Sequence, residues 1–87
     1  MEKTITITNE TGIHTRPGNK FVTLAKSFES KILVKNEETK KEVKGTSLLK
    51  LLSLGIKKNT KITLTTTGND EAKAMNELSE LLLNLKD

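Results

Sequence analysis

Apolar and polar residues alternate strictly along two segments of the chain. Glu2–Thr8 alternates isoleucine with threonine, and Lys61–Thr67 repeats the pattern with one isoleucine and one leucine. A period of two predicts a β-strand with one buried side and one side in solvent. We therefore expect both segments in a sheet that has a threonine-rich open face.

Two further segments space their apolar residues as helices do. The first is Thr15–Ser27, and the second follows a turn at Gly68-Asn69. The apolar stripe of the second helix consists of Met75, Leu78, Leu82 and Leu85. Asp70 and Glu71 are expected in its first turn, where acidic side chains interact favourably with the helix dipole.

A short helix is predicted over Leu48–Leu54. Ser47 precedes it as an N-cap, and Gly55 follows it as the C′ glycine that ends a helix. The segment has more leucine than one buried stripe requires, so part of it is expected to form an exposed contact patch.

Ile32–Val34 and Lys41–Lys44 complete the pattern as two short strands joined by a hairpin loop. The order strand, helix, strand, strand, helix, strand, helix predicts an α+β fold with helices on one side of a mainly antiparallel sheet. Residues 1–87 are expected to form a single domain. The pattern leaves the strand order open, and a ferredoxin-like arrangement with one added helix also fits it.

Composition removes several classes of function. The chain has no cysteine and one histidine, so disulfides and thiolate zinc sites are excluded and a metal site lacks ligands. A glycine-rich nucleotide loop is absent, and we expect no cofactor. Because no apolar run is long enough to span a bilayer, we expect a cytoplasmic protein without membrane contact. Nothing in the sequence demands self-association, so a monomer is expected.

The net charge of +4 at pH 7 favours an acidic partner. The chain has neither tyrosine nor tryptophan, and its two phenylalanines, Phe21 and Phe28, are spaced as core residues of a helix. A stacking platform for bases is therefore missing, and we expect a protein partner rather than nucleic acid.

The only histidine, arginine and proline of the chain lie within Thr11–Gly18. His14 offers a nucleophilic ring nitrogen, and Arg16 offers a fork of donors suited to phosphate. Pro17 fits the first turn of a helix, whose free N–H groups would point at an anion on the histidine. These features favour a phosphoryl group on His14, although a helix start that merely contains these residues fits equally well.

Ser47 is the second candidate. It is either a plain N-cap or a phosphorylation site with Lys44 and Lys50 near it in sequence. A phosphate there would add negative charge beside leucines that a partner could contact.

These two segments resemble a known family. Gly12-Ile13-His14-Thr15-Arg16-Pro17 is similar to the active-site loop of HPr, the histidine-containing phosphocarrier of the bacterial phosphoenolpyruvate-dependent sugar phosphotransferase system. The segment from Lys44 to Gly55 resembles the regulatory-serine helix of that family. The resemblance covers the whole chain and implies an open-faced β-sandwich, in which a four-stranded antiparallel sheet is covered on one face by three helices.

The resemblance implies a carrier rather than an enzyme. His14 would take a phosphoryl group from phosphorylated enzyme I and pass it to enzyme IIA domains, while Arg16 neutralises its charge. Thr15 and Pro17 would complete the loop. The implied partner surface consists of Lys20, Leu48, Leu49 and Lys50. Gly18 and Asn19 depart from the helix formers usual in the family and are expected to loosen the first turn.

The resemblance also gives Ser47 a role. In Gram-positive relatives the matching serine is phosphorylated by HPr kinase/phosphorylase, and that form acts as a corepressor with a catabolite control protein. One alternative is therefore a regulatory relative that acts mainly through Ser47. Another is a ferredoxin-like domain that binds a small molecule and does not depend on His14.

Overall fold

The computed structural model describes residues 1–85, which form four strands and three helices around one sheet. The elements are β1 (Glu2–Thr6), α1 (Thr15–Lys26), β2 (Lys31–Asn36), β3 (Lys41–Lys44), α2 (Leu48–Leu52), β4 (Lys61–Thr67) and α3 (Glu71–Leu83). The sheet order is β1-β4-β2-β3, and all neighbouring strands are antiparallel. This order settles the arrangement that the pattern left open.

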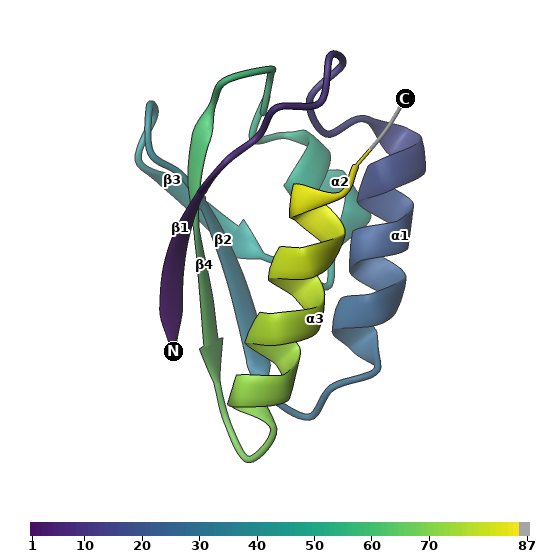
Figure 1. Ribbon diagram of the computed structural model, residues 1–87, viewed down its shortest axis with the longest axis vertical. Helices are drawn as coiled ribbons and strands as arrows, with labels where there is room; N and C mark the ends of the chain where they lie inside the picture. Colours follow the sequence, from purple (N-terminus) through teal and green to yellow (C-terminus); the bar gives the residue numbers. More distant parts are fainter. Residues whose placement is uncertain (86–87) are drawn as a thin grey trace.

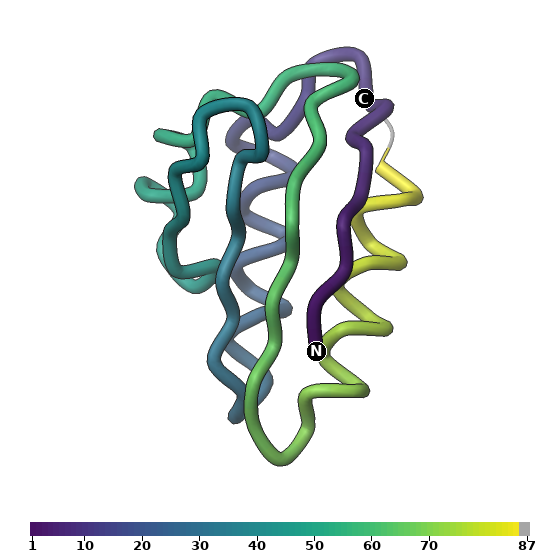
Figure 2. Tube along the Cα trace, turned by 90° about the vertical axis from the view of Figure 1, so that its left-hand side faces the viewer, coloured from purple at the N-terminus to yellow at the C-terminus, as the bar shows by residue number. Residues whose placement is uncertain are grey.

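The helices gather on one side of the sheet (Figure 1), and the strands face the viewer from the other side (Figure 2). The predicted open-faced α+β fold is therefore confirmed. The core lies between the two layers, and the largest fully buried side chains include Phe21, Ile62 and Leu78. Within residues 1–85, α1 and α3 are the longest helices, and neither has the length and apolar character of a membrane span.

The open face of the sheet carries threonines, as the alternation predicts, but it is not uniformly exposed. Thr4 and Thr6 lie in solvent, whereas Thr63 is only 7% exposed. The reason is that β4 lies between β1 and β2, so neighbouring side chains cover its outer face. The Thr63 hydroxyl donates to the Glu37 carboxylate at 2.5 Å and lies 3.2 Å from the Thr4 hydroxyl.

Gly18 brings α1 and α2 close together. Its N–H donates to the His14 carbonyl oxygen at 2.8 Å, so the first turn of α1 closes regularly despite the two weak helix formers. Gly18 is buried, and a Cβ on it would lie 3.1 Å from Leu48 Cδ1 and 3.4 Å from Leu52 Cδ2. The glycine therefore has a packing role, and the expected loosening does not occur at this hydrogen bond.

The start of α3 corrects one prediction. Asp70 is the N-cap residue rather than a first-turn residue, and its carboxylate makes no capping bond to α3. It instead accepts hydrogen bonds from the backbone N–H groups of Glu29 and Ser30, both at 2.9 Å, and from the Ser30 hydroxyl. Asp70 therefore ties the loop between α1 and β2 to α3. At the other end of this helix, Leu85 lies beyond the last helical residue, Leu83.

Candidate functional site

The loop before α1 can be built only with glycine at position 12. Gly12 has a φ of +64°, which side chains rarely adopt. A Cβ at this position would lie 2.2 Å from the Ile56 carbonyl oxygen. The backbone of the loop is therefore pressed directly against the segment that follows α2.

His14 occupies the N-cap position of α1. Its backbone is extended, with φ −109° and ψ −166°, and its exposed side chain makes no capping hydrogen bond. The bond from Gly18 N–H to the His14 carbonyl begins the helical ladder, so the N–H groups of Thr15 and Arg16 precede that ladder. Pro17 has no N–H, and at its first-turn position this removes no hydrogen bond from the helix. The start of α1 thus presents backbone donors beside an exposed imidazole.

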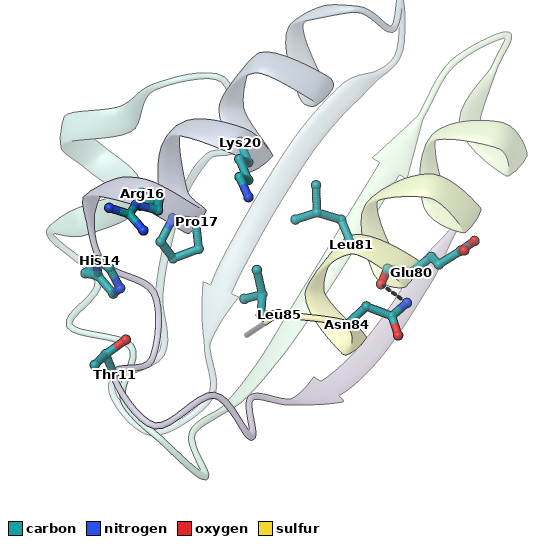
Figure 3. Close-up of a pocket in the computed structure, with 9 residues that line it drawn as sticks. All are labelled: Thr11, His14, Arg16, Pro17, Lys20, Glu80, Leu81, Asn84 and Leu85. Atoms are coloured by element: carbon teal, nitrogen blue, oxygen red, sulfur yellow. Dashed lines mark hydrogen bonds between the residues drawn. The ribbon is translucent and has the colours of Figure 1, made fainter. Parts of the chain in front are cut away.

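Because α1 and α3 are antiparallel, the start of α1 lies near the end of α3 (Figure 1). A groove of about 730 Å³ lies between these two helix ends (Figure 3). It is lined by Thr11, His14, Arg16, Pro17, Lys20, Glu80, Leu81, Asn84 and Leu85. Arg16 and Lys20 lie one helical turn apart, so both cations face the histidine side of the groove. The α3 side of the groove is partly apolar. The arrangement combines a nucleophile, two cations and backbone donors at an open surface, which suits an anion that must enter and leave.

The structure brings together most of the residues predicted for the histidine site. His14, Thr15, Arg16 and Lys20 are exposed and share one hollow, and Pro17 is buried beside them. The second predicted set lies on α2. Ser47 is its N-cap, and its hydroxyl oxygen accepts a hydrogen bond from Lys50 N–H at 3.4 Å.

The leucines of α2 divide between core and surface, as the excess of leucine predicts. Leu48 is half-buried against Gly18, whereas Leu49 is 82% exposed beside the exposed Lys50. The α2 residues do not line the histidine groove. The two predicted sets are nevertheless adjacent, because Leu48 packs against the first turn of α1 through Gly18.

Two features of the site escape sequence reasoning. The α3 wall of the groove, with Leu81 and Asn84, could not be assigned to the site without the antiparallel packing of α1 and α3. Asn9 is buried, and its side-chain amide donates to the Gly12 carbonyl oxygen at 2.8 Å. An asparagine in a turn usually signals only the turn itself, so its bond to the loop could not be inferred.

Among residues 1–85, no group of three or more histidine, cysteine, aspartate or glutamate side chains is placed to hold a metal ion.

Fold and site together define a small open-faced β-sandwich that presents one exposed histidine at a helix start. A family model described as "PTS HPr component phosphorylation site" matches residues 1–84. The chain therefore belongs to the HPr family, the phosphocarriers of the phosphotransferase system.

Individual relatives agree with this assignment. The chain is 38% identical over 82 residues to the phosphocarrier protein HPr of Neisseria meningitidis, covering 94% of this chain and 90% of the relative. The crystal structure of an HPr from Thermoanaerobacter tengcongensis superposes with a TM-score of 0.89 at 36% identity, covering 95% of this chain and 91% of that chain. The catabolite repression protein Crh of Bacillus subtilis superposes with a TM-score of 0.76 at 31% identity, covering 85% of this chain and 83% of that chain.

Proposed function

We propose that His14 is the phosphoryl acceptor and that the protein relays the group from phosphorylated enzyme I to sugar-specific enzyme IIA domains. The observation that supports this most directly is the exposed imidazole at the start of α1, beside Arg16 and the first-turn N–H groups. In the loading step, a ring nitrogen attacks the phosphorus atom, and the N–P bond forms as the bond to the donor breaks. Delivery is the reverse step with a different partner, so the protein acts as a carrier rather than an enzyme.

The open geometry suits reversible transfer. Arg16 supplies charge to the phosphoryl oxygens, and the backbone donors at the helix start supply hydrogen bonds. Because the site is a groove on the surface and not an enclosed cavity, the phosphoryl group stays accessible to the next acceptor. A deep pocket with several arginines would hold the group too tightly to release it.

The proposed partner surface combines the histidine groove with α2. Lys20 lines the groove, and Leu48, Leu49 and Lys50 lie on the adjacent short helix. A leucine that is 82% exposed next to a lysine would match a partner with an apolar centre and acidic rim. Enzyme I and enzyme IIA domains would share this surface in turn, and the expected cytoplasmic location is consistent with such partners.

Loading from phosphoenolpyruvate tests the proposal. The protein is mixed with purified enzyme I and magnesium, and acid-labile phosphate is detected by intact-protein mass spectrometry. We expect phosphate on the wild type and none on His14→Ala, which should unfold at nearly the wild-type temperature because the ring is exposed. Equal labelling of both proteins would exclude His14. No labelling of either, with enzyme I active on another carrier, would favour a regulatory protein that acts mainly through Ser47 or a ligand-binding domain.

We further propose that Ser47 is a regulatory phosphorylation site for an HPr kinase/phosphorylase and that the product binds a catabolite control protein. The proposal is supported by the position of Ser47 at the start of α2, as its N-cap and two residues before the exposed Leu49. A phosphate there would place negative charge at the edge of the proposed partner surface.

The Ser47→Asp variant places a lasting negative charge at this position. It should bind enzyme I more weakly by about fivefold, since one like charge at an interface rim costs about 1 kcal/mol. Isothermal titration calorimetry measures this change, with Ser53→Asp at the other end of α2 as the matched control. Wild-type affinity for Ser47→Asp would count against the regulatory role.

A further inference from the structure

Asn9 is a buried polar residue in the turn before His14, and the proposed function assigns it no role. It is 6% exposed, although its neighbours Thr8 and Glu10 lie in solvent. Its carbonyl oxygen accepts a hydrogen bond from the Gly12 N–H at 2.9 Å, and its side-chain Nδ2 donates to the Gly12 carbonyl oxygen at 2.8 Å. Because a buried amide is costly without a partner, this bond and a longer one of 3.5 Å from Nδ2 to the Thr11 hydroxyl make asparagine acceptable here.

The peptide unit between Gly12 and Ile13 is held at both of its polar groups. Its oxygen accepts from Asn9 Nδ2, and its N–H donates to the Ile56 carbonyl oxygen at 3.1 Å. The Ile13 side chain is 6% exposed and belongs to the core. His14 therefore follows directly after a backbone unit whose orientation is fixed, although its own ring lies at the surface.

We propose that Asn9 is a positioning residue for phosphoryl transfer at His14, an inference that rests on the proposed function. By holding the Gly12 carbonyl, Asn9 sets the direction in which the backbone enters α1. It thereby aligns the imidazole and the first-turn N–H groups relative to an incoming phosphorus atom. Pre-organisation of this kind raises the rate of a bound complex without adding a contact to the partner.

The test compares Asn9→Ala with Thr66→Val in the loading reaction. Thr66 is fully buried, and its hydroxyl donates to the Glu71 carbonyl oxygen at 2.9 Å. Its variant therefore removes the same kind of buried bond from side chain to backbone. Thr66 lies by the start of α3. The start of α3 and the start of α1 are at opposite ends of the molecule (Figure 1). The maximal rate and the KM for phosphorylation by enzyme I are measured at a temperature where circular dichroism shows both variants folded.

We expect Asn9→Ala to lower the maximal rate about fivefold to tenfold, as the loss of one positioning hydrogen bond predicts, with KM changed less than about twofold. Thr66→Val should keep the wild-type maximal rate. In hydrogen exchange, the Ile13 amide should exchange faster in Asn9→Ala while the amides of β4 remain protected. Asn9→Ser is a second variant in case Asn9→Ala does not fold, because serine is small, neutral and compatible with turns. Its side chain is too short to replace the bond to the Gly12 carbonyl, so it should show the same slowing.

A wild-type maximal rate in the folded Asn9 variants would overturn the positioning role. Equal slowing in Thr66→Val would also overturn it, because the effect would then follow from stability alone. A wild-type protein that accepts no phosphate would contradict the proposed function instead, so the two failures are distinct.

Discussion

At the scale of residues, His14 is exposed while the backbone that carries it is fixed. Gly12 is pressed against the Ile56 carbonyl, and Ile13 is buried in the core. A side chain that is anchored in this way can meet several partners without losing its orientation. Arg16 adds a permanent positive charge two residues after His14, at an exposed position of the same helix start.

The charge of Arg16 should affect the rate of phosphoryl loading more than the charge of any lysine in the chain. We expect Arg16→Ala to slow loading from enzyme I by about tenfold to a hundredfold, because a charged donor acts most strongly on the charge of the transition state. Initial rates at fixed enzyme I concentration measure the effect. Lys31→Ala on β2 removes the same charge far from the groove and should leave the rate within about twofold. Equal rates for the two variants would show that Arg16 has no role in phosphoryl loading.

At the scale of elements, close packing of α1 and α2 joins the histidine site to the serine helix. Gly18 lies at the contact, where its missing side chain leaves room for Leu48 and Leu52. Helix propensity alone suggests that glycine weakens this turn. The close packing of the two helices explains why a glycine is nevertheless present. The two phosphorylation candidates therefore lie at the starts of two helices that pack directly against each other.

Gly18→Ala tests whether the helix contact or the helix propensity has the larger effect on the free energy of unfolding. Alanine favours the helix by about 1 kcal/mol. Its Cβ would lie tightly against the flexible ends of two half-buried leucines and in ordinary van der Waals contact with Ile13. We expect the free energy of unfolding in urea to rise by up to about 1 kcal/mol. Gly12→Ala should instead lose about 2 kcal/mol or more, because its Cβ would overlap backbone atoms and its φ is unfavourable. A destabilised Gly18→Ala would show that the two helices cannot move apart.

At the scale of the whole molecule, carboxylates join segments that lie far apart in the chain. The Ser30 hydroxyl and the neighbouring backbone N–H groups lower the pKa of Asp70 across the loop between α1 and β2. Hydrogen bonds from Lys40 and Thr63 lower the pKa of Glu37 to about 2. The amide of Gly68 and the N-terminal ammonium lower the pKa of Glu71.

These shifts predict that the fold weakens in acid. A carboxyl with a lower pKa in the folded state stabilises the fold at pH values above its ordinary pKa, and this contribution is lost as the pH falls through the folded pKa. For Glu37 the loss should therefore run from pH 4.5 down to about 2. Urea midpoints measured across this range should fall with pH, and the fall should be shallower in Asp70→Asn and in Glu37→Gln. Glu42→Gln on β3 is the control, and an identical slope in all four proteins would contradict the prediction.

The sequence predicts correctly those features that depend on neighbouring residues. Features that depend on tertiary packing were predicted incompletely. The alternation of β1 and β4, the Ser47 cap and the cluster of His14 with Arg16 follow from neighbours within a few residues. The partner of Asp70 lies 40 residues away, and the loop bond of Asn9 depends on a turn backbone that spacing does not define. The alternation pattern is the same in any antiparallel order and therefore left the strand order open, and only the family resemblance implied the open-faced β-sandwich that the structure has.

The most direct test of the central claim is to load and unload one isotopically labelled sample while observing every residue by NMR. Phosphoenolpyruvate with a trace of enzyme I is added first, and an enzyme IIA domain is added afterwards. We expect the signals of the His14 ring nitrogens and of the backbone N–H groups of residues 12–16 and 18 to shift on loading and to return to their starting positions on addition of the acceptor. A phosphoryl group that loads elsewhere, or that leaves His14 only by hydrolysis in the presence of an active acceptor, would contradict the carrier function.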